Sequence, residues 1–151
     1  MAFEVPLPDI AATQALAQRI AGRLQPGDTI ALSGGLGAGK TTLARALIAA
    51  LGHDGEVPSP SFAIIELYEP PAVRLPVVHA DFYRVENPAE LEEIGLDDYR
   101  QGAALIAEWP EHAGGFEHEP GCLSIRFEVM ENTRWAIVDP GRDWLKRGPW
   151  T

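Results

Sequence analysis

Residues 33–42 read Ser-Gly-Gly-Leu-Gly-Ala-Gly-Lys-Thr-Thr, a glycine-rich segment that ends in Lys-Thr-Thr. From Gly34 to Thr41 it follows the P-loop pattern, which is Gly, four residues and then Gly-Lys-Thr. Glycines let successive backbone N–H groups turn toward phosphate oxygens, because a Cβ atom would block the approach. We therefore expect a nucleotide site in which Lys40 reaches the β- and γ-phosphates and Thr41 ligates Mg²⁺.

The residues on either side of the P-loop have the order that the motif requires. Residues 28–32, Asp-Thr-Ile-Ala-Leu, are largely apolar and predict a buried strand that enters the loop. Residues 40–51 predict a helix with leucines on one face and Gly52 as its C-terminal stop. The positive N-terminal end of that helix would add to the attraction for phosphate.

The chain has 151 residues, a length at which we expect one domain, 1–151, with its own core. Lys and Arg total 12 against 22 Asp and Glu, which gives a formal net charge of −10. Because affinity for nucleic acid depends largely on basic residues that neutralise phosphates, we do not expect tight direct binding to nucleic acid. Basic protein surfaces are the more natural partners, although an acidic balance can equally serve solubility alone.

Three other features of the sequence narrow the class of protein. Cys122 is the only cysteine, which excludes an internal disulfide and a Cys-based zinc site. No apolar run approaches the roughly 20 residues of a membrane span, and the first residues do not have the pattern of a signal peptide. We therefore expect a cytoplasmic protein that does not associate with membranes.

The lysines bear on the choice of nucleotide. Lys40 and Lys146 are the lysines of the chain, and neither follows an Asn with an Asp two residues later. The guanine-specifying Asn-Lys-x-Asp motif is therefore absent from the sequence. Adenine is the expected base.

The rest of the chain alternates between helical and strand periodicity. The predicted helices are 10–24, capped by Asp9, and a short one from Pro88, where Asn87 and Glu90 would form a capping box. The predicted strands are 62–68, 75–82, 103–109, 123–129 and 134–138. This order predicts an α/β fold, a three-layer P-loop NTPase-like domain with a mostly parallel central sheet and antiparallel hairpin strands at the edge.

Two carboxylates compete for the acidic position that a P-loop site needs near its metal. Glu108 and Asp81 each end an apolar run, as a strand that emerges beside the phosphates would. Both could act, with Glu108 holding Mg²⁺ and Asp81 orienting or deprotonating the attacking water. His79 is more often a structural histidine than a catalyst. Arg84 either neutralises γ-phosphate charge or forms an ordinary surface ion pair.

Further motifs follow the P-loop in order. They are Ser-Pro-Ser-Phe (59–62), in a loop that could act as a mobile lid, His-Ala-Asp-Phe-Tyr-Arg (79–84), Glu-Leu-Glu-Glu-Ile-Gly-Leu-Asp-Asp-Tyr (90–99) and Glu-Trp-Pro-Glu (108–111). Together with the P-loop they resemble the TsaE family, bacterial ATPases of tRNA threonylcarbamoyladenosine biosynthesis, over about residues 5–138. The P-loop alone is generic, whereas Asp-x-Tyr-Arg and Glu-Trp-Pro at this spacing are specific.

The resemblance implies an ATPase that uses ATP and Mg²⁺ and works with the partner proteins TsaB and TsaD. Those partners attach threonylcarbamoyl to adenosine 37 of tRNAs that read codons beginning with A, so this chain would meet tRNA only through the complex. By position, Thr41 and Glu108 would hold Mg²⁺, and Asp81 and Lys40 would be catalytic. The residues that would bind the nucleotide are Gly34, Gly37, Ala38, Gly39, Lys40, Thr41, Thr42, Arg134 and Ile10.

The chain departs from the family pattern at Gly35, where the family usually has Asp, and at Ser61, where it usually has Thr. Ser61 keeps the hydroxyl, whereas Gly35 removes a charge beside the phosphate loop. Two other functions remain open. A small-molecule kinase would share the fold and the P-loop but should carry a basic lid. A nucleotide-gated adaptor would need the P-loop and could dispense with Asp81.

Overall fold

A computed structural model describes residues 2–35, 37–58 and 64–150. The proposed lid residues Ser59 and Ser61, and the predicted start of a strand at Phe62, lie outside the described residues. The rest of the chain folds around one mixed sheet.

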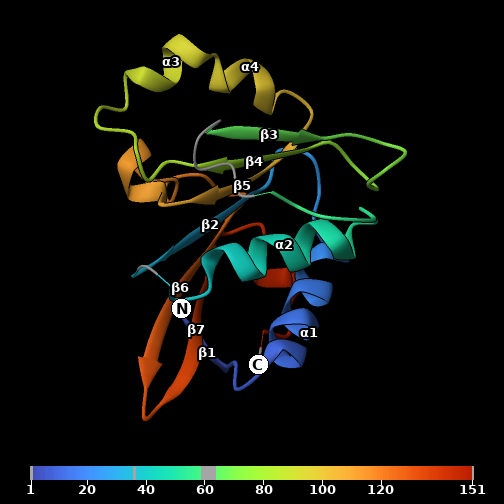
Figure 1. The fold of residues 1–151 in the computed structure, drawn as a ribbon, viewed down its shortest axis with the longest axis vertical. Coiled ribbons are helices and arrows are strands. Elements are labelled where there is room, and N and C mark those ends of the chain that lie inside the picture. Colours follow the sequence, from blue (N-terminus) through green and yellow to red (C-terminus); the bar gives the residue numbers. More distant parts are fainter. Residues whose placement is uncertain (1, 36, 59–63, 151) are drawn as a thin grey trace.

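The described residues contribute seven strands to this sheet, in the order β1-β7-β6-β2-β5-β4-β3 (Figure 1). The strands are β1 (Phe3–Pro6), β2 (Thr29–Gly34), β3 (Ile65–Tyr68), β4 (Val77–Asp81), β5 (Ala104–Glu108), β6 (Cys122–Met130) and β7 (Thr133–Pro140). The central strands β6, β2, β5 and β4 are parallel. Antiparallel strands form both edges, with β3 on one side and β7 and β1 on the other. The predicted α/β class, with a parallel centre and antiparallel edge hairpins, is confirmed.

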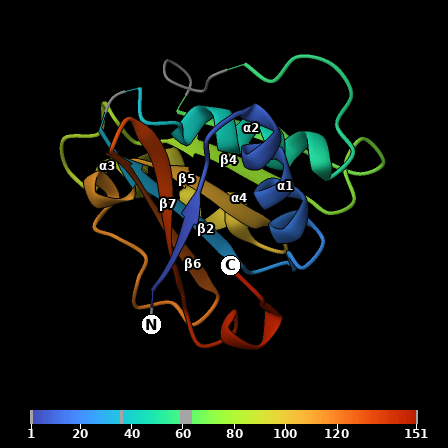
Figure 2. The same cartoon turned by 90° about the horizontal axis from the view of Figure 1, so that it is seen from below.

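Helices cover both faces of the sheet. They are α1 (Ile10–Ala21), α2 (Lys40–Ala50), α3 (Glu90–Ile94) and α4 (Leu96–Arg100), with short 3₁₀ turns η1 (Pro110–Ala113) and η2 (Leu145–Arg147). Figures 1 and 2 show α1 and α2 side by side on one face, whereas α3 and α4 lie against the other. The result is the predicted three-layer arrangement.

The alternation of side chains along β2 explains the two cores. Ile30 and Leu32 point into the core beneath α1 and α2, while Ala31 points to the core beneath α3 and α4. A strand buried on both faces needs apolar residues at nearly every position, which is why this segment has a continuous apolar run. Burial of each large aliphatic side chain stabilises the folded state by about 1.5–3 kcal/mol.

The register of the sheet brings the predicted acidic residues to the P-loop. β2 lies between β5 and β6, so the P-loop leaves the centre of the sheet. Leu32, near the end of β2, is opposite Glu108 at the end of β5, and Glu108 is opposite Asp81 at the end of β4. Parallel strands that end at the same edge therefore present both carboxylates beside the start of α2.

The hairpin β6–β7 forms as its sequence predicts. Glu131 and Asn132 both have positive φ, 53° and 64°, the conformation of the two-residue turns that connect antiparallel strands. Asp9 also caps α1 as predicted, because its Oδ1 accepts a hydrogen bond of 2.9 Å from the backbone N–H of Ala12.

Three local predictions differ from the structure. The first helix ends at Ala21, three residues early, because the chain leaves the helix at Gly22. The helix expected from Pro88 begins at Glu90. Its capping box does not form as predicted, since the Glu90 carboxylate accepts from the backbone N–H of Glu86 rather than from that of Asn87.

Candidate nucleotide-binding site

Lys40 lies inside the turn of the P-loop. It begins α2, is 5 % exposed, and its Nζ donates hydrogen bonds to the backbone oxygens of Gly34 (2.8 Å) and Gly35 (2.6 Å). The same ammonium group lies 4.3 Å from the centroid of the Trp109 ring, a favourable cation–π distance. The one cation of the P-loop is therefore held where phosphates would enter.

Burial and charge act on Lys40 in opposite directions. Burial lowers the pKa of Lys40 from its ordinary value, because the charged form is less well solvated. The carboxylates of Glu108, Glu111 and Asp81 oppose that shift by favouring the charged form. The site thus pairs a buried cation with acidic groups from neighbouring strands.

Two P-loop glycines have a positive φ, a conformation that favours glycine. Gly34 has φ 134°, and a Cβ there would lie 2.9 Å from the backbone oxygen of Phe127. Gly39 has φ 120°, and a Cβ there would lie 3.2 Å from Cδ of Arg134. At Gly34 both the conformation and the close backbone of β6 require glycine, whereas at Gly39 the positive φ favours glycine and the nearest atom belongs to the flexible Arg134 side chain.

Glu108 connects the P-loop helix to the sheet. Its side chain is buried, and Oε1 accepts a hydrogen bond of 2.6 Å from the Thr41 hydroxyl. On the other side, Oε2 lies 2.7 Å from Nε2 of His79, which belongs to β4. The predicted metal pair Thr41 and Glu108 is thus brought together, and His79 joins it.

Asp81 lines the same cavity as the P-loop. It is 6 % exposed, and Oδ1 accepts a hydrogen bond of 3.0 Å from the backbone N–H of Tyr83. The cavity has a volume of about 320 Å³, in the size range of small-molecule sites. Its lining residues are Gly37, Ala38, Lys40, Thr41, Thr42, Asp81, Tyr83, Arg84, Glu108 and Trp109.

The oxygen ligands of this cavity suit Mg²⁺. Mg²⁺ prefers oxygen ligands and is usually held by one or two protein groups together with phosphates and water. Across the described ranges no group of three or more His, Cys, Asp or Glu residues could hold a metal by itself. Thr41 and Glu108 could therefore hold Mg²⁺ with phosphate oxygens, rather than as an all-protein metal site.

Arg134 reaches the P-loop from β7. Its Nη2 donates to the backbone oxygen of Gly37 at 3.4 Å. Arg134 also lines a neighbouring hollow of about 370 Å³, on which the side chains of Ile10 and Val129 are exposed by 59 % and 67 %. Neither Ile10 nor Arg134 lines the P-loop cavity, but Arg134 joins this hollow to the P-loop through its hydrogen bond to Gly37.

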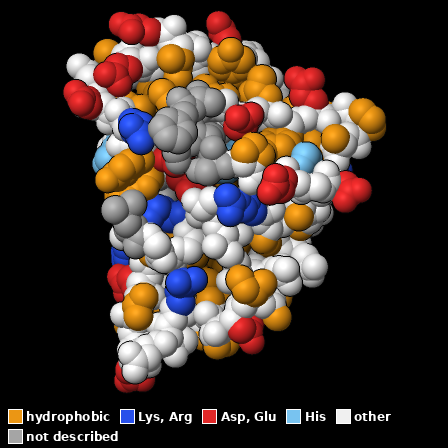
Figure 3. Space-filling model, in the orientation of Figure 1, with side chains coloured by type: hydrophobic (Ala, Val, Ile, Leu, Met, Phe, Trp, Pro, Cys, Tyr) orange, Lys and Arg blue, Asp and Glu red, His pale blue; other side chains and the backbone are white. Residues whose placement is uncertain are grey.

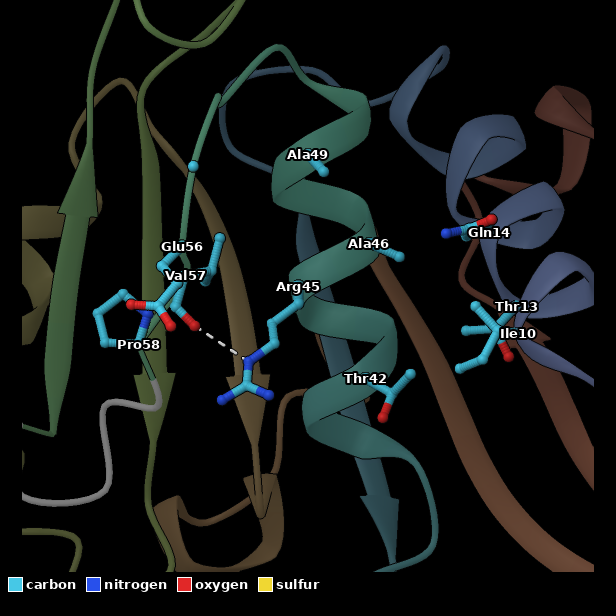
Figure 4. Close-up of a pocket in the computed structure, with 11 residues that line it drawn as sticks. Ile10, Thr13, Gln14, Thr42, Arg45, Ala46, Ala49, Glu56, Val57 and Pro58 are labelled. Carbon is cyan, nitrogen blue, oxygen red and sulfur yellow. Dashed lines mark hydrogen bonds between the residues drawn. The ribbon is translucent and has the colours of Figure 1, made fainter.

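A further cavity of about 500 Å³ lies away from Asp81 and Glu108. Figure 4 shows it over the outer surface of α2, between α1 and residues 55–58, where Nε of Arg45 donates to the backbone oxygen of Val57 at 3.0 Å. It shares Thr42 with the P-loop cavity and Ile10 with the hollow beside Arg134. Lys40, Asp81 and Glu108 do not line it, so these three predicted site residues belong to the smaller P-loop cavity.

Trp109 is part of the site although composition and periodicity give no reason to select it. It has φ 58°, an uncommon conformation for a bulky residue, and its backbone N–H donates to the oxygen of Leu32 at 3.1 Å. Its ring packs near those of Tyr83 and His112, with centroids 4.9 and 5.4 Å away. Strain of this kind occurs where the surrounding structure fixes a functional geometry.

Charged side chains of both signs lie on one face of the molecule. In Figure 3 separate Lys and Arg side chains lie in the middle of the face and along its left side, while most Asp and Glu side chains lie toward its outline.

The site and the fold together define a class of protein. A buried central strand, a glycine-rich loop, a helix that begins Lys-Thr and acidic strand ends make this a P-loop protein of the α/β class. The family model described as "Threonylcarbamoyl adenosine biosynthesis protein TsaE" matches residues 7–136. The chain belongs to the TsaE family, whose role is in tRNA threonylcarbamoyladenosine biosynthesis.

Individual relatives agree with this assignment. A tRNA threonylcarbamoyladenosine biosynthesis protein TsaE from Rickettsia prowazekii is 30 % identical over 125 residues, which cover 81 % of this chain and 83 % of that protein. The protein of the same name from Bacillus subtilis is 42 % identical over 98 residues, covering 64 % and 60 %. The crystal structure of Bacillus subtilis YdiB matches with a TM-score of 0.76 and 29 % identity, covering 97 % of this chain and 91 % of that one. Within the described ranges, no helix has the length and apolarity of a membrane span.

Proposed function

We propose that this chain is a Mg²⁺-dependent ATPase that acts with TsaB and TsaD in forming threonylcarbamoyladenosine at position 37 of tRNAs that read codons beginning with A. The observation that carries the proposal is one cavity that contains Lys40, the hydrogen-bonded pair Thr41 and Glu108, and Asp81. Phosphoryl chemistry needs these parts, namely a phosphate cradle, a cation, a metal position and an acidic group for the nucleophile.

The hydrogen bond between Arg134, which lines the neighbouring hollow, and Gly37 of the P-loop suggests how ATP would lie. Its phosphates would rest on the P-loop, with the N-terminus of α2 pointing at them. The adenine would extend past Arg134 into the neighbouring hollow, between the exposed side chains of Ile10 and Val129. Apolar side chains on both sides of a flat base would exclude water from its faces, which accounts for two exposed aliphatic residues at this place.

The residues of the cavity would have separate roles in ATP hydrolysis. Mg²⁺ held with Thr41 and Glu108 would neutralise charge on the phosphates. Lys40 would exchange its bonds to loop carbonyls for bonds to phosphate oxygens, which are charge-assisted and therefore stronger. Asp81 would orient the attacking water and accept its proton, since it lines the same cavity one strand away from Glu108.

The charge balance supports a role within a complex. A net charge of −10 opposes tight binding to bare tRNA, so tRNA would be met through TsaB and TsaD, in the cytoplasm. Hydrolysis by the chain alone should be slow. ATP should strengthen the complex, because the γ-phosphate and Mg²⁺ can order loops at a binding surface.

Reconstitution tests the proposal. TsaB, TsaD, tRNA, a threonylcarbamoyl donor and ATP are mixed with the wild-type chain, with Lys40→Ala or with Lys146→Ala, the exposed matched control. Modified adenosine should accumulate with the wild type and the control but not with Lys40→Ala. The proposal would be contradicted if, in every nucleotide state, the chain neither associated with TsaB and TsaD nor stimulated the formation of modified adenosine. Phosphorylation of a small acceptor in a parallel screen would favour the kinase.

A further inference from the structure

His79 is a buried polar residue to which the proposed chemistry assigns no task. It lies in the middle of β4 and is 0 % exposed. Its Nε2 lies 2.7 Å from Oε2 of Glu108, while Nδ1 has no hydrogen-bond partner among the described residues. An apolar side chain would avoid the cost of burying an unpartnered ring nitrogen, so packing alone does not explain a histidine here.

The contact with Glu108 supplies a reason. An ionised carboxylate can only accept hydrogen bonds, so the imidazole proton must lie on Nε2 to make this contact favourable. Nδ1 is then an unpartnered acceptor. The histidine therefore satisfies one oxygen of a buried carboxylate at the expense of its own second nitrogen.

The two oxygens of Glu108 are held from opposite sides. Thr41 of α2 bonds to Oε1 at 2.6 Å, and His79 of β4 bonds to Oε2 at 2.7 Å. Without the second bond, the carboxylate could rotate about its terminal torsion, which is broad for Glu side chains. The pair of bonds fixes the plane of the carboxylate and directs Oε1 to the helix that begins at the P-loop.

We propose that His79 is a positioning residue that fixes the Glu108 carboxylate and thereby sets the affinity of the site for Mg²⁺ with nucleotide. This inference rests on the proposed function, since it assigns His79 to the metal that ATP hydrolysis would use. His79 acts through Glu108 rather than on the nucleotide, because the P-loop cavity is lined by Glu108 and not by His79. Residues that orient metal ligands typically change metal affinity by about 10- to 100-fold when mutated.

Four variants test the inference. His79→Leu removes the donor. His79→Gln keeps one, because its amide nitrogen is as many bonds from Cα as Nε2 of histidine. His79→Asn is also polar but ends one bond short. Val77→Ala, on the same strand and in the same buried layer, controls for a disturbed core.

The readout is binding of a fluorescent ADP analogue as a function of Mg²⁺ concentration, with thermal melting of each variant alongside. For His79→Leu and His79→Asn, the Mg²⁺ concentration for half-maximal binding should rise about 10- to 100-fold. Binding without Mg²⁺ should stay within a few-fold of wild type. His79→Gln and Val77→Ala should keep a nearly normal Mg²⁺ requirement.

Two outcomes would overturn the inference. One is an unchanged Mg²⁺ requirement in His79→Asn and His79→Leu. The other is an equal loss in Val77→Ala or His79→Gln, which would make the effect one of packing. If His79→Leu does not fold, the comparison of His79→Gln with His79→Asn still shows whether a hydrogen-bond donor to Glu108 is needed. Wild-type protein that binds no nucleotide at any Mg²⁺ concentration would instead overturn the proposed function.

Discussion

Replacing each buried carboxylate by its amide should separate metal binding from hydrolysis. Asp81→Asn and Glu108→Gln keep the volume of residues that are 6 % and 1 % exposed, so neither leaves a cavity. Each removes one negative charge near Lys40. The two substitutions are therefore matched in size and charge, and they differ in which contacts they change.

The contacts of Glu108 determine how much the Mg²⁺ requirement should rise in Glu108→Gln. The two oxygens of Glu108 accept from Thr41 and face His79, whereas the amide of Gln offers one oxygen and one NH2 group, so one of these two hydrogen bonds must be lost or reverse its direction. A lost bond to a buried group costs about 1–3 kcal/mol, which corresponds to about 5- to 150-fold in the Mg²⁺ requirement. Asp81→Asn should instead leave nucleotide affinity within a few-fold and slow hydrolysis by about 10²–10⁴, the usual contribution of a general base.

Single-turnover hydrolysis at saturating ATP, measured across a Mg²⁺ titration, distinguishes the Asp81→Asn variant from the Glu108→Gln variant. High Mg²⁺ should restore much of the rate of Glu108→Gln and none of the rate of Asp81→Asn. If Mg²⁺ rescues Asp81→Asn and not Glu108→Gln, the two roles are assigned the wrong way round. If both variants hydrolyse ATP at the wild-type rate, the cavity is not the hydrolytic site.

Two further predictions concern stability. Burial alone would raise the pKa of Glu119, but hydrogen bonds from Arg100 and Thr29 and the charge of Arg100 outweigh it and hold the pKa below its ordinary 4.5. A depressed carboxyl pKa contributes stability above pH 4.5 that is lost as the pH falls through the folded-state value. Thermal melts should therefore show Glu119→Gln less stable than wild type at pH 7, with the difference shrinking below pH 4.5; a difference that grows in acid would contradict this. Gly34→Ala should destabilise the fold by more than about 1 kcal/mol, because φ is 134° and Cβ would meet a backbone oxygen, whereas Gly35→Ala, with nothing within 4 Å, should melt like wild type. Equal melting temperatures for Gly34→Ala and Gly35→Ala would show that the loop does not require glycine at position 34.

The sequence predicts those parts of the fold that local rules determine. The run 28–32, the P-loop and the helix from Lys40 agree with the structure, because an apolar run, glycine chemistry and helical periodicity all act within a few residues. The approach of Glu108 to Thr41 was also predictable, since acidic residues that end parallel strands must meet at one edge. The roles of these residues in binding and catalysis remain predictions.

Features that depend on register across the sheet could not be predicted. The sequence does not predict β1, because this strand has four residues of which Val5 alone is buried, and it forms through its pairing with β7. His79 reads as an ordinary core histidine until β4 and β5 are aligned, and that alignment brings its ring to Glu108. The local capping signal at Asn87 and Glu90 also predicts the start of α3 incorrectly, because the Glu90 carboxylate accepts from the backbone N–H of Glu86 instead of that of Asn87.

Calorimetric titration with Mg-ATP tests whether the P-loop cavity binds the nucleotide through Lys40. The proteins compared are wild type, Lys40→Ala and Lys146→Ala. Loss of a charge-assisted contact to phosphate should cost Lys40→Ala about 1.5–3 kcal/mol, or about tenfold to more than a hundredfold in affinity. The exposed control Lys146→Ala should bind like wild type. Wild-type affinity for Mg-ATP in Lys40→Ala would show that Lys40 does not hold the phosphates.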